Sequence, residues 1–185
     1  MNLFLLDTDI EVNVRCHVDD HVNKIALEAA QVLSTALWLN ETPGVAYDAS
    51  TWYKYSRWDT DARRSMHRAY GPTRIGPLSR WCQNPVNYMW TLRYAVELCK
   101  EHQYRKGKII QTWRMLSQLP RFTVIESPKT WYAAVADELM NPDELSRGKL
   151  VDTDRAVEVY RQYYQRHRSH LHRWTKRERP EWLQS

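Results

Sequence analysis

The stretch that most constrains the fold runs from Asp19 to Trp38, where apolar residues recur every three or four positions. Residues three or four apart lie on one face of an α-helix, so this spacing predicts an amphipathic helix with one buried face. An aspartate at position 19 or 20 is suited to cap its first turn. The expected buried face comprises Val22, Ile25, Ala26, Ala29, Val32, Leu33 and Ala36.

A polar row follows the same helix beside the apolar face. Its members also step by three and four: His21, Lys24, Glu28, Gln31 and Thr35. A row in this position lies at the edge of the core, where it would form the floor of a cleft, and an acid, a base and an amide there suit general acid–base chemistry. The alternative interpretation is that Lys24 and Glu28 form an ordinary surface ion pair one turn apart.

The rest of the chain predicts a mainly α fold. Asn84-Pro85 starts a helix that runs to about Tyr104, a shorter one covers 109–119, and Asp152 or Asp154 caps a last helix that ends near Trp174. The opening residues are expected to be a short buried strand or extended segment. Two long irregular connections are expected, with a short helix in 44–83 and a helical turn at 130–139. Together these features predict a compact single-domain bundle of about four or five helices over residues 1–185.

The three cysteines, Cys16, Cys82 and Cys99, form no CxxC pair, which predicts free buried thiols in a reducing compartment. The apolar start stops at Asp7 and is too short for a signal peptide or a membrane span, so we expect a cytoplasmic protein without membrane contact. The histidines near residues 17–21 and 167–172 have spacings known from zinc sites but lack a four-ligand set. We therefore expect no metal and no cofactor.

Positive charge is concentrated near the C-terminus. Residues 155–179 hold eight of the 27 Lys and Arg but two of the 22 acids, which gives this stretch a net charge of +6 and the remainder −1. This pattern predicts a basic C-terminal helix and tail over about 152–185 that faces a polyanion, or else a solvated helix face. The expected DNA-contacting residues are Arg161, Tyr164, Arg166, Arg168 and Arg173, together with Gln31 on the first helix and Trp52 and Tyr53 in the aromatic loop.

Six motifs are distributed over most of the chain: Met1–Asp7, Asp19–Leu33, Asn87–Trp90, Leu98–Glu101, Tyr160–Tyr164 and Pro180–Trp182. In these motifs the chain resembles a set of uncharacterised phage proteins. More distantly, in two helices and the tail, it resembles the phage pyrimidine-dimer DNA glycosylases of the endonuclease V type.

The glycosylase resemblance implies a mechanism. In that family an N-terminal amine attacks the sugar carbon and forms a Schiff base, and a glutamate on the first helix assists. By position, Glu28 corresponds to that glutamate and His21 to a histidine of the cleft. The amine would be that of residue 1 or of Asn2. Because Met is usually retained before Asn, Lys24 is a second candidate for the amine.

The leading hypothesis is therefore a base-excising DNA N-glycosylase, possessing AP-lyase activity in one version, that acts on damaged or modified duplex DNA in the host cytoplasm. The first alternative is a non-catalytic DNA-binding or phage accessory protein. A further alternative is an enzyme that acts on a nucleotide or another small molecule. These hypotheses differ in whether sugar chemistry occurs and in whether the C-terminal arginines are needed for function.

Overall fold

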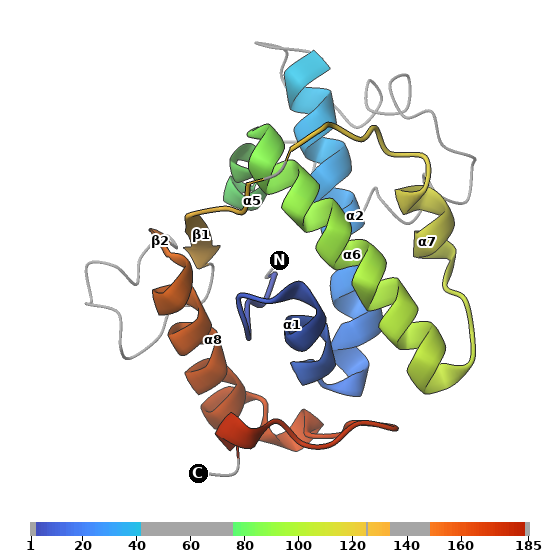
Figure 1. The fold of residues 1–185 in the computed structure, drawn as a ribbon, viewed down its shortest axis with the longest axis vertical. Coiled ribbons are helices and arrows are strands. Elements are labelled where there is room, and N and C mark those ends of the chain that lie inside the picture. The colour runs from blue at the N-terminus through green and yellow to red at the C-terminus, as the bar shows by residue number, and fades with distance from the viewer. Residues whose placement is uncertain (1–2, 42–75, 125, 134–148, 184–185) are drawn as a thin grey trace.

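The computed structural model describes residues 3–41, 76–124, 126–133 and 149–183, and this part of the chain is mainly helical, as predicted (Figure 1). Six α-helices and one small sheet are present in these ranges. Their bounds are α1 Ile10–Cys16, α2 Asp19–Glu41, α5 Pro77–Trp81, α6 Pro85–Lys106, α7 Gln111–Leu116, β1 Thr130–Ala133, β2 Lys149–Asp152 and α8 Thr153–His167. Two 3₁₀ turns follow, Ser169–Leu171 and Glu181–Leu183.

Helices α2 and α6 form the largest helix–helix contact of the described fold and cross one another in Figure 1. All seven apolar residues expected to face inward from α2 are buried, so that prediction is confirmed. The cap prediction is wrong, because Asp19 and Asp20 both lie inside the first turn of α2, and the carboxylate of Asp19 bonds to other segments. The bundle is therefore organised around one helix whose face the spacing identified.

The two ends of α6 follow their sequence signals. The Asn84 side chain accepts a hydrogen bond from the Val86 amide at 2.8 Å, and Pro85 occupies the first helical position. Proline is well tolerated there because that amide would have no helical partner. Gly107 ends the helix with φ 69°, a left-handed conformation that costs glycine little.

The N-terminal segment lies in the middle of the molecule, between α8 and α6 (Figure 1). Residues 3–6 are buried, and within the described ranges they belong to no helix and no sheet. Helix α1 follows, and it was not predicted. Its signal was Asp9, whose carboxylate accepts from the amides of Glu11 and Val12 as an N-cap.

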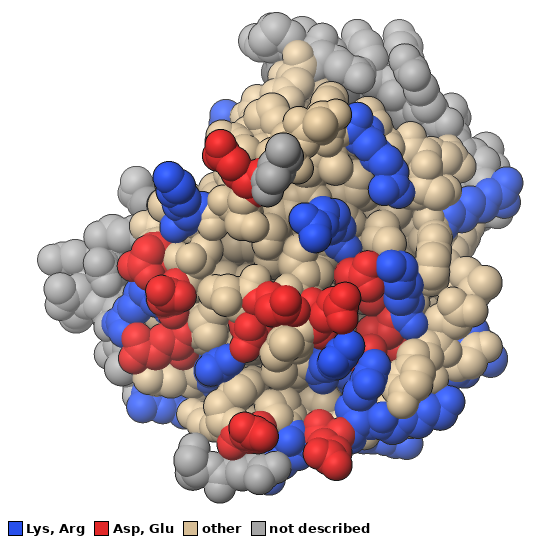
Figure 2. Space-filling view, viewed as in Figure 1, with Lys and Arg blue, Asp and Glu red and all other residues tan. Residues whose placement is uncertain are grey.

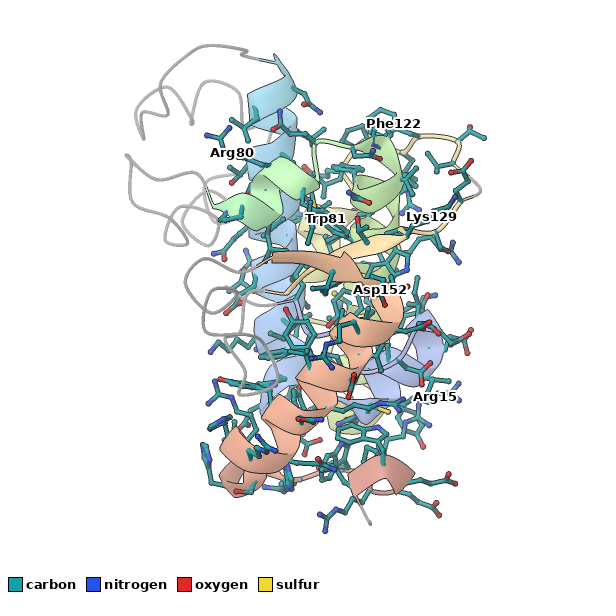
Figure 3. The ribbon with its side chains drawn as sticks, turned by 90° about the vertical axis from the view of Figure 1, so that its left-hand side faces the viewer. Arg15, Arg80, Trp81, Phe122, Lys129 and Asp152 are labelled. Carbon is teal, nitrogen blue, oxygen red and sulfur yellow. The ribbon has the colours of Figure 1, made fainter. Side chains whose placement is uncertain are left out.

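The antiparallel hairpin of β1 and β2 was also not predicted. Thr130–Ala133 is a strand, so the helical turn expected from residue 130 is wrong there; the rest of that turn lies outside the described residues. Trp131 drives the difference, because its ring packs edge-on against Trp81 and Trp90 and its indole N–H donates to the Leu3 carbonyl. Figure 3 shows Trp81 behind the hairpin and Asp152 at the start of α8.

Helix α8 begins as predicted, with Asp152 accepting from the Arg155 amide, but it ends at His167 rather than near Trp174. The chain then bends back so that Thr175 and Arg177 reach acids on α2 and α6. Helix α7 is likewise shorter than expected, and Ile109 before it is exposed. Among the helices of the described ranges, none is long and apolar enough to cross a bilayer.

Candidate functional site

The members of the polar row on α2 differ in how much of each side chain is exposed. His21, Gln31 and Thr35 are buried, the Glu28 side chain keeps 16% of its surface, and the Lys24 side chain keeps 67%. The Thr35 hydroxyl donates to the Gln31 carbonyl one turn back, which ties it to its own helix. The members that combine reactivity with some access are therefore Lys24 and Glu28.

Lys24 and Glu28 lie one turn apart, with Nζ and Oε1 separated by 4.0 Å. This distance is within ion-pair range but longer than a hydrogen bond. Glu28 is also felt in the core. The pKa of the buried Tyr94 hydroxyl on α6 is raised, mainly by burial and in small part by the charge of Glu28. An exposed amine thus lies beside a carboxylate that is largely withdrawn from water.

His21 is fixed on three sides. Its ring stacks on Phe4 with centroids 4.9 Å apart, and its Nδ1 lies 2.5 Å from the Tyr164 hydroxyl of α8. Burial, together with the charges of Arg168 and Lys24, lowers the pKa of His21 to about 4, so its ring is neutral at pH 7. Burial also raises the pKa of Tyr164 well above 10. A neutral hydroxyl can donate or accept here, and we assign Tyr164 as the donor to Nδ1, with the proton of His21 on Nε2.

A second histidine–tyrosine pair lies behind the first. His17 Nδ1 is 2.8 Å from the Asn13 carbonyl, and its Nε2 is 2.7 Å from the Tyr94 hydroxyl. Burial lowers the pKa of His17 to about 3, so this ring too is neutral, with its proton on Nδ1. Spacing had offered His17 as a metal ligand; the structure makes it a core hydrogen-bonding residue instead.

The expected DNA contacts on α8 are largely engaged within the protein. Tyr164 is fully buried, so the expectation that it is exposed for base stacking is wrong. The reason is its position four residues after Tyr160, which places both rings on the same helix face. Arg161 donates to the Leu6 carbonyl and to Asp7, at 2.7 and 2.8 Å.

The other basic residues of the prediction differ in their surroundings. Arg168 lies over the Tyr163 ring and donates to its hydroxyl. Arg166 is exposed, and the Arg173 side chain keeps 79% of its surface. Arg166 and Arg173 are therefore the more exposed of these cations, and Arg161 and Arg168 are half-buried.

Asp19 is the acid that draws the tail onto α2, a role that spacing did not reveal. Its carboxylate accepts from Arg105 and Lys106 at 3.0 Å, and from the amide and hydroxyl of Thr175 at 2.9 and 2.5 Å. Burial opposes its ionisation, but these hydrogen bonds outweigh burial and hold the pKa of Asp19 below its usual range. Arg173 Nε lies 3.6 Å from the same carboxylate.

Glu101 on α6 also binds the tail. It accepts from Arg105 at 2.8 Å and from two nitrogens of Arg177, each at 2.8 Å. Burial is again opposed by the hydrogen bonds, here from Arg177 and Arg105, and the pKa of Glu101 is lowered. The i,i+4 spacing of Glu101 and Arg105 was the available sequence signal for this network.

Three further predictions concern other parts of the chain. Asn2, Trp52 and Tyr53 lie outside the described residues. Cys16, Cys82 and Cys99 are free and buried, as predicted, and burial raises the pKa of Cys82 and of Cys99 to about 12. In the described ranges, no three His, Cys, Asp or Glu side chains are grouped to hold a metal ion.

In comparisons with known proteins, no family model, no curated protein and no solved structure matches this chain. The resemblance to phage DNA glycosylases therefore stays a prediction.

Proposed function

We propose that the protein is a DNA-acting enzyme of the N-glycosylase type, with AP-lyase activity, whose active site is the row His21, Lys24 and Glu28 on α2. The observation that carries the proposal is the exposed Lys24 amine 4.0 Å from a Glu28 carboxylate that is mostly withdrawn from water. An amine and a carboxylate in this arrangement suit attack at a sugar carbon followed by proton transfer.

The chemical step is as follows. Lys24 first transfers a proton to Glu28, and the Nζ lone pair then forms a bond to C1′ of the sugar while the glycosidic C1′–N bond breaks and its electron pair leaves with the base. Glu28 passes that proton to the departing base. Glu28 next takes a second proton from Nζ and passes it to O4′ as the sugar ring opens, which gives an iminium. Removal of a C2′ proton by Glu28, with departure of the 3′ phosphate, would then cleave the strand. Glu28 also stabilises the positive charge that develops on the sugar.

His21 has a supporting role in this proposal. It is neutral at pH 7 and, with Nδ1 accepting from Tyr164, presents an N–H at Nε2. A neutral imidazole can donate a hydrogen bond to a substrate oxygen without adding charge beside Lys24. Such an enzyme must also extrude the target nucleotide from the duplex.

The second candidate is a non-catalytic DNA-binding protein. The observation that favours it is the set of exposed cations near the tail, Arg166, Arg173 and Lys176, which need no sugar chemistry to bind phosphates. This candidate predicts DNA binding that weakens with salt and leaves the bases intact.

Borohydride trapping separates the two. The protein is mixed with undamaged, ultraviolet-damaged, abasic and base-modified duplexes, and the iminium is reduced to a stable secondary amine. We expect a covalent protein–DNA adduct with at least one damaged or modified duplex. Absence of adducts and of new abasic sites on every substrate, with DNA binding retained, would establish the non-catalytic candidate instead.

Two variants define the roles. Glu28→Gln keeps the shape of the side chain and removes its charge, so base release should fall about 100-fold or more, the usual range for a lost acid–base group. Glu97→Gln, at a half-buried acid of α6 that pairs with Lys100, is the matched control and should retain full activity. Equal activity of Glu28→Gln and the wild type would remove Glu28 from the mechanism.

A further inference from the structure

The end of the molecule where α6 meets the tail carries more cations than its acids neutralise. Within 4 Å of the carboxylates of Asp19 and Glu101 lie four cationic side chains: Arg105, Lys106, Arg173 and Arg177. Two carboxylates therefore organise four positive charges. In Figure 2, Lys and Arg side chains gather at the lower right, over the end of α6 and the tail.

The excess persists when the neighbouring residues are included. Residues 104–108 and 172–179 contain seven Lys and Arg. The acids counted with them are Glu178 in the second segment, Asp19 and Asp20 at the start of α2, and Glu101 on α6. This region thus has three positive charges more than negative ones. A rigid region with net positive charge attracts polyanions and raises their local concentration.

These cations differ in burial, and the buried and exposed ones have different roles. The Arg105 side chain is fully buried and also donates to the carbonyls of Arg15 and His17. Arg173 keeps 79% of its side-chain surface, and Lys108 and Lys176 are exposed. Buried Arg105 fixes the backbone, and the exposed residues present their charge to solvent.

The positions of the exposed residues are set by hydrogen bonds of their segments. The Lys176 amine donates to the Tyr104 carbonyl at 2.9 Å, and the Lys108 carbonyl accepts from His102. The Arg173 carbonyl accepts from the first amide of α2 at 2.9 Å. Cations held in place in this way lose less conformational freedom when they bind a ligand.

An aromatic side chain lies among them. Tyr104 is 48% exposed, and the Arg177 guanidinium carbon lies 4.1 Å from the centre of its ring. Exposed aromatic rings beside arginines provide surfaces on which nucleic-acid bases stack, a feature that an acidic protein partner does not require. The combination of fixed cations and an exposed ring therefore favours nucleic acid over a polyanion without bases.

We propose that Tyr104, Lys108, Arg173 and Lys176 form the surface that contacts the nucleic-acid backbone, hereafter the tail-end surface. This inference depends on the proposed DNA function. It assigns DNA binding to the tail-end surface instead of to the basic face of α8. On that face two of the charges are neutralised locally, since Arg155 pairs with Glu158 and Arg161 with Asp7. DNA held at the tail-end surface contacts the protein near the start of α2, the helix that carries Lys24 and Glu28.

The test measures binding of fluorescent duplex and single-stranded oligonucleotides by anisotropy over a series of salt concentrations. The variant Lys108→Gln/Arg173→Gln/Lys176→Gln removes three exposed charges. It leaves Arg105, Lys106 and Arg177 on the two carboxylates and loses the 3.6 Å contact of Arg173 with Asp19. Its expected effect is a salt slope reduced by roughly two to three units and an affinity at least about tenfold weaker. The matched control, Arg93→Gln/Arg121→Gln/Lys129→Gln, removes three exposed cations elsewhere and should bind nearly as the wild type does.

The outcomes are distinct. If the wild type binds no DNA even at low salt, the proposed function itself fails. If it binds DNA and the two triple variants behave alike, the tail-end surface is not the contact, although the proposed function survives. Binding to phosphatidylserine vesicles without binding to DNA would also overturn the inference, in favour of a membrane. The thermal midpoint of each variant shows whether folding is intact. A variant that keeps the charges, Lys108→Arg/Lys176→Arg, should retain most of the wild-type affinity for DNA.

Discussion

Asp19 and Glu28 are acids of one helix, yet their surroundings differ. Asp19 is enclosed by Arg105, Lys106 and Thr175, with donor–acceptor distances between 2.5 and 3.0 Å. Glu28 has its lysine neighbour at 4.0 Å and keeps 16% of its side-chain surface. The first environment holds a charge within a network of short hydrogen bonds, and the second places a carboxylate beside an exposed amine.

These two environments show that the charges of this chain are divided between ion pairs that hold the fold and groups that remain near the surface. A net charge of +6 in residues 155–179 suggested one polyanion surface, but much of that charge binds Asp7, Asp19 and Glu101 and holds the tail to the bundle. Acids of the Asp19 kind support the fold. Acids of the Glu28 kind are candidates for chemistry. Removing Asp19 should lower mainly stability, and removing Glu28 should lower mainly activity.

The largest expected effect on stability follows from Asp19→Ala. It leaves the fully buried Arg105 with one carboxylate instead of two and releases Thr175 from α2. Breaking a buried ion pair costs about 3–5 kcal/mol, so the free energy of unfolding in urea should fall by that amount. Asp20→Ala, at the exposed neighbouring position, is the control and should cost under about 1 kcal/mol. Similar losses for the two variants would contradict the role given to Asp19.

An intermediate effect is expected from pH. The pKa of His17 is lowered to about 3 and that of His21 to about 4, mainly by burial, whereas in the unfolded chain both lie near 6.5. Between these values the unfolded chain binds more protons than the folded one, so stability is full above pH 6.5 and is lost as pH falls. Each histidine contributes a slope of about 1.4 kcal/mol per pH unit in that window.

Urea unfolding at pH 7.5, 6.5, 5.5 and 4.5 measures this slope. His17→Gln and His21→Gln should each be less stable than the wild type at pH 7.5 but should show a shallower loss below pH 6.5. His102→Gln, at a half-buried position on α6, is the control and should keep the wild-type slope. A wild-type stability that is constant from pH 7.5 to 4.5 would show that the buried histidines do not govern acid unfolding.

The smallest effect on stability is expected at the proposed site. An i,i+4 ion pair with an exposed partner contributes a few tenths of a kcal/mol, so Lys24→Ala should change the free energy of unfolding by less than about 0.5 kcal/mol. Its activity on DNA should nevertheless be lost. A variant that is strongly destabilised would instead identify Lys24 as a structural residue and remove the contrast with Asp19.

Sequence periodicity predicted the helices well where the residues followed a helical repeat. The buried face of α2 and the caps of α6 and α8 were evident because Asn84 and Asp152 accept local hydrogen bonds that depend on neighbouring residues alone. The hairpin was not evident, because it depends on Trp131 packing against Trp81 and Trp90 from distant parts of the chain.

The candidate site shows the same limit. Spacing placed His21, Lys24 and Glu28 on one row, which the structure retains. It did not reveal that Tyr164 fixes His21, because 143 residues separate the two, nor that the tail arginines would bind Asp19 and Glu101. Interactions between segments far apart in sequence require tertiary structure, and these determine which charges remain available for a ligand.

The central claim, that the row on α2 performs amine chemistry on DNA, is tested most directly by locating the adduct. Borohydride-trapped complexes are digested, and the peptide that carries the sugar remnant is sequenced by mass spectrometry. The account predicts modification of Lys24 in the wild type and loss of the adduct in Lys24→Ala, while Lys100→Ala, which alters an exposed lysine of α6, retains it. A modified N-terminal amine, or a full yield of adduct from Lys24→Ala, would contradict the assignment of Lys24 as the nucleophile.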